Sequence, residues 1–157
     1  MVNLHWWEVY QAAITGVMRH VKSIQDNRKS TPYMDSEYAR WGVNVEGAIA
    51  ECAFAKAFGM YWGQSVDTFK EPDVGNRVQV RQTEKDTHCL IVKEKDNDNH
   101  IYVLLIGSRG HYWIVGWILG KDAKQKKWIF DPRKTGVVSY FVPQSELHPI
   151  ETIREVL

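Results

Sequence analysis

The sequence lacks several motifs that would assign it to a common functional class. Its two cysteines, Cys52 and Cys89, lie far apart and outside any Cys-x-x-Cys pair, which argues against a thiolate zinc site and a disulfide framework. Gly-x-x-x-x-Gly-Lys-Ser/Thr and Gly-x-Gly-x-x-Gly loops are absent, so a nucleotide-phosphate loop is not expected. There is no Gly-x-Ser-x-Gly elbow, and no two of the six histidines have the helical spacing of a zinc pair.

Charge of one sign is not in excess either. The 20 lysine and arginine residues face 19 aspartate and glutamate residues, a formal net charge of +1. A surface that is basic all over is therefore excluded, although a local basic groove is not. No window is apolar and long enough to span a membrane, and the N-terminal residues show no secretory signal. We expect a cytoplasmic protein with no membrane partner.

The composition is that of a folded domain. Hydrophobic residues make up 44% of the 157 residues, so residues 1–157 are expected to form a single domain with its own core. Apolar residues near the N-terminus recur at steps of three and four, which predicts a helix with one apolar stripe. The members of this stripe are Leu4, Trp7, Ile14, Val17, Val21 and Ile24. We expect the stripe to pack on the core, with Asn3 as a helix cap.

A second helix is predicted to begin at Asp35 or Ser36 and to end at Gly59, after a polar loop at 26–35. Period-two patterns then predict strands at 77–83, 89–93, 101–106, 113–119 and 137–142. The polar turn at 94–99 indicates a hairpin, and 143–147 a turn or one helical turn. Helices followed by a meander of about four strands predict an α+β fold, with N-terminal helices packed on a mainly antiparallel mixed sheet.

Four polar residues are candidates for a shared site. Glu51 lies among alanines on the second predicted helix, where an unpaired carboxylate would be costly to bury. Asp73 follows a proline in a turn that leads into the strand at 77–83, and Gln79 and Arg81 share one face of that strand. These side chains can converge at one end of the sheet. Glu51, Asp73 and Gln79 would then supply the few protein oxygens that a magnesium ion needs.

A purely structural explanation of the same residues remains open. Glu51 could form a buried ion pair with Arg81 or Lys56, and Asp73 could cap its own turn. Gln79 and Arg81 could be the solvent-facing side of an edge strand. The metal-site hypothesis requires the carboxylates of Glu51 and Asp73 to converge, and it fails if they point apart.

At these positions the chain resembles the PD-(D/E)XK nuclease superfamily. The family order is a helix carboxylate, then Pro-Asp, then an acidic residue, one apolar residue and a lysine on the next strand. Here those positions are Glu51, Pro72-Asp73 and Gln79-Val80-Arg81. The chain is also similar to small phage- or prophage-encoded proteins at 50–56, 72–75, 116–124 and 142–144, a likeness that covers most of its length. The resemblance implies a single nuclease-like domain with a restriction-endonuclease-like fold, located in the host cytoplasm if phage-encoded.

The resemblance also implies an activity, the hydrolysis of DNA phosphodiester bonds with Mg²⁺ or Mn²⁺ held by Glu51, Asp73 and Gln79. Gln79 is neutral where the family has a carboxylate, so metal affinity should fall. Arg81 replaces lysine, and it can hold a phosphate but cannot act as a general base at neutral pH. The alternative is a nuclease-like fold that has lost cleavage and serves as a nucleic-acid- or protein-binding accessory, in anti-defence or DNA processing.

A basic cluster beside an aromatic residue is the second candidate feature. Its members are Lys121, Lys124, Lys126, Lys127 and Trp128. Such a cluster can grip a phosphate backbone and stack a base, whereas a solvated loop is the alternative for the lysines alone. Trp6 and Trp7 are adjacent on one helix and cannot both face the same way, which indicates a partner or dimer surface. DNA and a second copy of the chain are therefore the expected partners.

Overall fold

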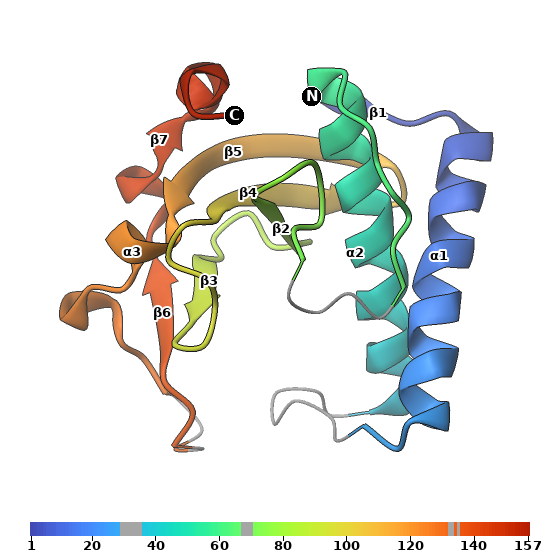
Figure 1. The fold of residues 1–157 in the computed structure, drawn as a ribbon, viewed down its shortest axis with the longest axis horizontal. Helices are drawn as coiled ribbons and strands as arrows, with labels where there is room; N and C mark the ends of the chain where they lie inside the picture. Colours follow the sequence, from blue (N-terminus) through green and yellow to red (C-terminus); the bar gives the residue numbers. More distant parts are fainter. Residues whose placement is uncertain (29–35, 67–70, 132–133, 135) are drawn as a thin grey trace.

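The computed structural model describes every residue except 29–35, 67–70, 132–133 and 135. Two long helices, α1 (Trp6–Gln25) and α2 (Glu37–Phe58), precede the strands. Figure 1 shows α1 as the outermost element, α2 beside it, and the strands beyond α2. The expected α+β class, with N-terminal helices and a mixed sheet, is confirmed. Most of the predicted loop between the helices lies outside the described residues.

The main sheet is mixed and mostly antiparallel, as expected. Its order is β1 (Val2–Asn3), β5 (His111–Leu119), β4 (Ile101–Ser108) and β2 (Val78–Thr83), and β7 (His148–Pro149) also pairs with β5. All of these pairs are antiparallel except β2 with β4, which is parallel. The hairpin between β4 and β5 turns at 109–110.

The predicted meander is wrong in one respect. Strand β3 (Leu90–Lys93) joins neither β2 nor β4, but pairs with β6 (Ser139–Val142) in a separate two-stranded sheet. The turn at 94–99 therefore does not close a hairpin. Instead, the segment 84–100 is the long crossover that a parallel pair of strands requires.

The main sheet is covered on both faces, which explains why β4 is buried almost throughout. Ile101, Val103 and Leu105 belong to the core cluster that includes α2. Tyr102 and Leu104 point the other way, into a second cluster built with β3 and β6. Figure 1 shows the two-stranded sheet on the side of the molecule away from the helices. The molecule thus has helices, main sheet and small sheet in succession.

Short helical segments complete the chain after β5. They are α3 (Gly120–Ala123) and the 3-10 turns η1 (Lys126–Trp128), η2 (Gln144–Glu146) and η3 (Ile150–Glu155). The helical turn predicted after β6 is confirmed as η2. Within the described part of the chain, none of the helices has the length and apolar character needed to cross a lipid bilayer.

Helix α2 begins and ends where its sequence signals predict. The Ser36 hydroxyl oxygen accepts a hydrogen bond from the Ala39 backbone N–H at 3.1 Å, a standard N-cap. Gly59 ends the helix with a φ of 66°, a left-handed conformation that favours glycine. The buried face of α2 is rich in alanine, including Ala50 and Ala53, which brings the helix close to the sheet.

Helix α1 contradicts the prediction made from its apolar stripe. Of the six stripe residues only Leu4 is buried, and it precedes the helix; the other five are exposed. The face that packs on α2 is instead small and polar, with Ala12, Thr15, Gly16 and His20 buried. The proposed cap is also wrong, because Asn3 belongs to β1 and pairs with His111 of β5. The periodicity of the sequence identified the apolar stripe, but it did not reveal that the stripe faces away from the core.

The helices approach most closely at Gly16. A Cβ atom at Gly16 would lie 2.5 Å from the Asn44 carbonyl oxygen and from the Val45 Cα, both backbone atoms of α2. We expect Gly16→Ala to lower the free energy of unfolding by about 1–3 kcal/mol, because the helices must separate. Denaturant unfolding would measure this. Gly42→Ala is the matched control, since a Cβ at Gly42 meets nothing within 4 Å and alanine there should stabilise α2 by up to about 1 kcal/mol. A stabilising Gly16→Ala would contradict the close approach.

Candidate functional site

A cavity of about 1100 Å³ lies between α2, β2 and the small sheet. Its lining takes in three of the four predicted site residues, Asp73, Gln79 and Arg81. Pockets for small ligands are roughly 300–1,000 Å³, so this one is large enough for a segment of a polymer. Three acidic and three basic side chains line it: Glu71, Asp73, Asp96, Arg81, Lys93 and Lys95. The cavity therefore offers both anion-binding and cation-binding groups.

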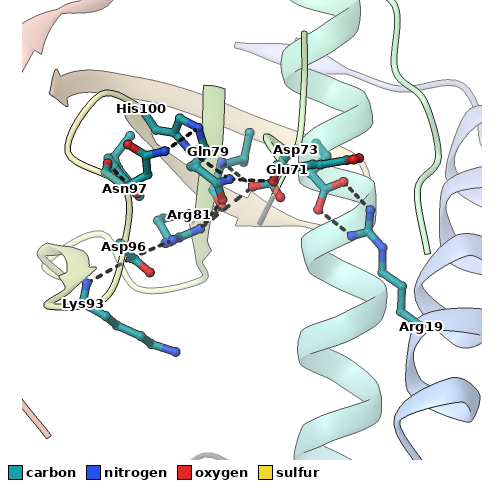
Figure 2. Close-up of polar contacts among 12 residues, drawn as sticks. Arg19, Glu71, Asp73, Gln79, Arg81, Lys93, Asp96, Asn97 and His100 are labelled. Atoms are coloured by element: carbon teal, nitrogen blue, oxygen red, sulfur yellow. Dashed lines mark hydrogen bonds and ion pairs between the residues drawn. The ribbon is translucent and has the colours of Figure 1, made fainter. Parts of the chain in front are cut away.

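Arg81 is placed between two carboxylates. Its Nη2 donates to Asp96 Oδ2 at 3.0 Å, and its Nη1 lies 3.9 Å from Asp73 Oδ2. Figure 2 shows the guanidinium group between these two acids. The guanidinium carbon also lies 5.2 Å from the ring centroid of Tyr102. Because ion pairs and an aromatic face fix its position, Arg81 is a preorganised cation on the cavity wall.

Glu51 has a different partner from the two that its sequence context indicated. It pairs with Arg19 of α1, not with Arg81 or Lys56. The two guanidinium nitrogens of Arg19 donate to the two Glu51 oxygens at 2.6 and 2.8 Å. The indole N–H of Trp62 donates to Oε2 at 3.0 Å. Glu51 is only 5% exposed, so the bidentate pair satisfies a carboxylate that would otherwise be buried without a counter-charge.

Asp73 is held by the turn that precedes β2. Its backbone N–H donates to the Val78 carbonyl at 2.8 Å, and its Oδ2 accepts from the Val80 N–H at 2.8 Å. The predicted tight turn is confirmed, with Gly75 at a φ of 58°. These bonds fix the carboxylate at the N-terminal end of β2, facing Arg81.

The electrostatic surroundings of Asp73 are unusual. Removal from bulk water, and then the negative charge of Glu51, raise the pKa of Asp73 to about 7, although Arg81 and the Val80 N–H oppose the shift. The influence of Glu51 means that the two predicted carboxylates lie in one electrostatic environment. Around neutral pH, Asp73 is therefore poised between its charged and neutral forms.

Gln79 lies within a small network of polar groups. Its side-chain nitrogen donates to the Glu71 carbonyl at 3.0 Å and lies 3.4 Å from His100 Nδ1, and its Oε1 accepts from Arg81 Nη1 at 3.4 Å. Burial lowers the pKa of His100, and the charges of Arg77 and Arg81 lower it further. His100 is therefore neutral at physiological pH, and Figure 2 shows it between Gln79 and Asn97.

Lys93 and Lys95 are cavity residues that the sequence reasoning missed. Lys93 lines the cavity from β3, and no described residue offers its ammonium group a hydrogen-bond or ion-pair partner. Burial and then the charge of Arg81 lower the pKa of Lys93. The alternation of β3 places Lys93 on the same face as Ile91, which also lines the cavity, so this signal was available.

The basic cluster predicted at 121–128 does not line the cavity. Lys124 Nζ donates to the carbonyls of Glu94 and Asp96 and pairs with Asp98 at 2.7 Å, so it fastens the segment after β3. Trp128 is buried in the second core cluster, where its ring is not available to stack on a base. Lys121, Lys126 and Lys127 are exposed, and Lys127 lies over the Trp128 ring.

The oxygen donors for a cation are few. In the described ranges, no group of three or more His, Cys, Asp or Glu side chains is arranged to hold a metal ion. Of the three predicted donors, Asp73 and Gln79 line the cavity with one carboxylate and one amide, whereas both oxygens of Glu51 accept hydrogen bonds from Arg19 and Trp62. That set suits Mg²⁺, which keeps several waters and takes one or two protein carboxylates plus substrate phosphate. Searches against protein-family models, curated proteins and solved structures found no match to this chain.

Proposed function

We propose that the chain is a nuclease of the PD-(D/E)XK type, with a restriction-endonuclease-like fold, that cleaves DNA phosphodiester bonds with Mg²⁺ or Mn²⁺. The observation that carries this proposal is that Asp73, Gln79 and Arg81 line one large cavity, where burial and then the charge of Glu51 raise the pKa of Asp73. Burial and a neighbouring carboxylate make the charged form of Asp73 costly. A bound cation would remove that cost, because an adjacent positive charge favours ionised carboxylates.

The charges of the site support the same conclusion. Glu51 pairs with Arg19, and Arg81 lies between Asp73 and Asp96, so these two separate groups of ion pairs together hold three carboxylates and two guanidinium groups, a net charge of −1 when Asp73 is ionised. A divalent cation and one phosphodiester group together add +1. Before the charge of Lys93 is counted, the complex of these five groups, the cation and the phosphate would therefore be neutral, which lowers the cost of keeping it away from bulk water.

Each residue then has a role that its position allows. Asp73, Glu51 and Gln79 would hold the cation through side-chain oxygens. When bound, such an ion lowers the pKa of a water molecule and polarises the phosphate. Arg81 and Lys93 would hold phosphate oxygens, Arg81 through its planar pair of N–H groups and Lys93 as a point charge.

A second candidate is a nuclease-like fold that binds nucleic acid without cleaving it. The hydrogen bonds of Glu51 favour this candidate. Arg19 and Trp62 donate three of them, so they already occupy three of the roughly four lone-pair directions of the carboxylate. Gln79 also contributes no charge. In that case Arg81 and Lys93 would still bind phosphate, while Asp73 would only order the turn before β2.

Plasmid cleavage and mobility-shift assays separate the two candidates. We expect nicking in Mg²⁺ or Mn²⁺, none in EDTA, and binding without cleavage in Ca²⁺, which binds oxygen ligands but seldom supports this chemistry. Binding without cleavage in every metal would favour the second candidate. A protein that neither binds nor cleaves DNA contradicts both. RNA substrates of the same length belong in the same assay.

Lys93→Ala is expected to weaken DNA binding several-fold and to reduce the salt slope of log Kd by about one, because one phosphate contact is lost. The fold should be unchanged, since the Lys93 ammonium has no partner among the described residues. Fluorescence anisotropy at several salt concentrations would measure both quantities. Lys126→Ala is the matched control, an exposed lysine outside the cavity. Equal losses in the two variants would place the contact surface at the basic cluster instead.

A further inference from the structure

The outer face of α1 carries a row of exposed apolar side chains. Six residues form the row, with exposed fractions from 38% to 61%: Trp7, Tyr10, Ile14, Val17, Val21 and Ile24. Trp6 and Met18 flank it and are 80% and 54% exposed. Among the described residues, none covers this row: the buried residues of α1 lie on its opposite face, and Figure 1 shows α1 as the outermost element.

The spacing within this row is that of a helix-pairing seam. The six positions follow one another at alternating steps of three and four along α1, the a and d pattern of a coiled coil. A helix that packs on a globular core normally has a broader apolar face, and it turns that face inward. In α1 the inward face is small and polar. Helix α1 thus carries an apolar row with the spacing of a helix-pairing interface, and none of the described residues of the same chain covers it.

The size of the row matches a stable interface. From their exposed fractions, the eight side chains present on the order of 800 Å² of surface, about what each partner buries in a standard protein–protein interface. The largest apolar patch on a typical monomer is only about 300–600 Å². An exposed patch of this area that includes two tryptophans and a tyrosine has the composition of an interface core.

The lack of charged residues directly beside the row favours a second copy of the chain as the partner that covers it. The exposed positions that flank the row are Gln11, Met18 and Gln25 on one side and Trp6 on the other, with no Asp, Glu, Lys or Arg among them, while Ala13 and His20 turn toward the core and α2. The nearby Glu8 is paired with Lys56 of its own chain. A second copy can therefore approach without like-charge repulsion. A membrane surface is less suited, because interfacial helices expose a basic face beside the apolar one.

We propose that α1 packs against α1 of a second copy of this chain through this row, in a twofold-symmetric dimer. The interface is isologous, so each apolar side chain meets the same row of the partner. No residue of α1 lines the cavity, so both cavities stay open in the dimer. The dimer does not depend on the proposed nuclease activity.

Sedimentation equilibrium of the full chain from about 1 to 100 μM tests the proposal. We expect twice the monomer mass for the wild type, and a monomer for the double variant Ile14→Lys/Val21→Lys, with affinity lowered at least 100-fold. The introduced lysines meet the same row of the partner and repel. Both residues are exposed in the single chain, so circular dichroism should remain unchanged. Tyr61→Lys, at a residue that is 85% exposed outside α1, is the control and should stay dimeric.

Mixing opposite charges supplies a second readout. Ile14→Lys/Val21→Lys mixed with Ile14→Glu/Val21→Glu should form heterodimers, because each lysine then faces an acidic partner. A wild type that is monomeric at 100 μM overturns the proposal, even if it binds lipid vesicles or another protein. A double variant that remains a folded dimer also overturns it, since the interface would then lie elsewhere.

Discussion

Arg19→Met is expected to lower the free energy of unfolding by about 3–5 kcal/mol at pH 7. The substitution removes both N–H···O bonds to Glu51 and leaves a carboxylate that is 5% exposed with only the Trp62 N–H as a partner. Losing one member of a buried ion pair costs this much because the remaining charge is uncompensated. Denaturant unfolding measured by tryptophan fluorescence and circular dichroism would give the value.

The double variant Arg19→Met/Glu51→Met is the control for this result. It removes both charges and fills similar volume with apolar groups, so it should recover most of the lost stability. A loss below about 1 kcal/mol at pH 7, equal in the single and double variants, would mean that the pair contributes little. If Glu51 binds a cation, Mg²⁺ should restore part of the stability of the single variant.

Asp73→Asn is expected to have opposite effects on activity and on stability. Cleavage should fall at least about 100-fold, since the loss of a cation ligand costs no less than the loss of its supporting groups. In metal-free buffer at pH 8 the variant should be more stable than the wild type by on the order of 2 kcal/mol, because the raised pKa makes charged Asp73 unfavourable in the folded state.

The pH dependence of stability follows from the direction of this shift. The folded-state pKa of about 7 lies above the ordinary value, so the folded protein binds more protons than the unfolded chain between about pH 4 and pH 7. Wild-type stability should therefore fall as the pH rises through that window, and the stability of Asp73→Asn should fall less. At pH 4, where both side chains are neutral, the two proteins should be nearly equal.

Adding Mg²⁺ at pH 8 separates a metal site from a merely strained carboxylate. The wild type should gain melting temperature with increasing Mg²⁺ and the variant should not, because a ligand stabilises only the state that binds it. Equal melting temperatures for the two metal-free proteins at pH 8 would mean that Asp73 is well solvated. Equal responses to Mg²⁺ would place any cation elsewhere.

The sequence predicted those features that depend on local chemistry. The helix start at Ser36, the helix end at Gly59 and the turn that leads from Asp73 into β2 are set by neighbouring backbone and side-chain groups, and all three predictions were confirmed. The five longer strands were also found near their expected positions. The antiparallel pairing of β4 with β5 was also expected, but the pairing of β3 with β6 was not, because these two strands lie far apart in the sequence and alternation does not say which strands meet.

In the candidate site, too, the sequence predicted what depends on neighbouring residues and missed what depends on contacts between distant elements. Asp73, Gln79 and Arg81 were correctly placed together because one turn and one strand carry them. The partner of Glu51 was missed, since Arg19 is on another helix and only helix packing brings it near. Lys93 was missed because its strand was assigned to the wrong sheet. Contacts between elements that are distant in the sequence determined both features that were missed.

The separate two-stranded sheet has a consequence for how the protein responds to a ligand. A pair of short strands is only marginally stable alone, so β3 and β6 depend on the second core cluster for their position. Lys93 and Arg81 lie on different sheets, and a phosphate bound by both would join them. Ligand binding would then couple the two sheets and slow amide hydrogen exchange in β3 and β6 more than in α2.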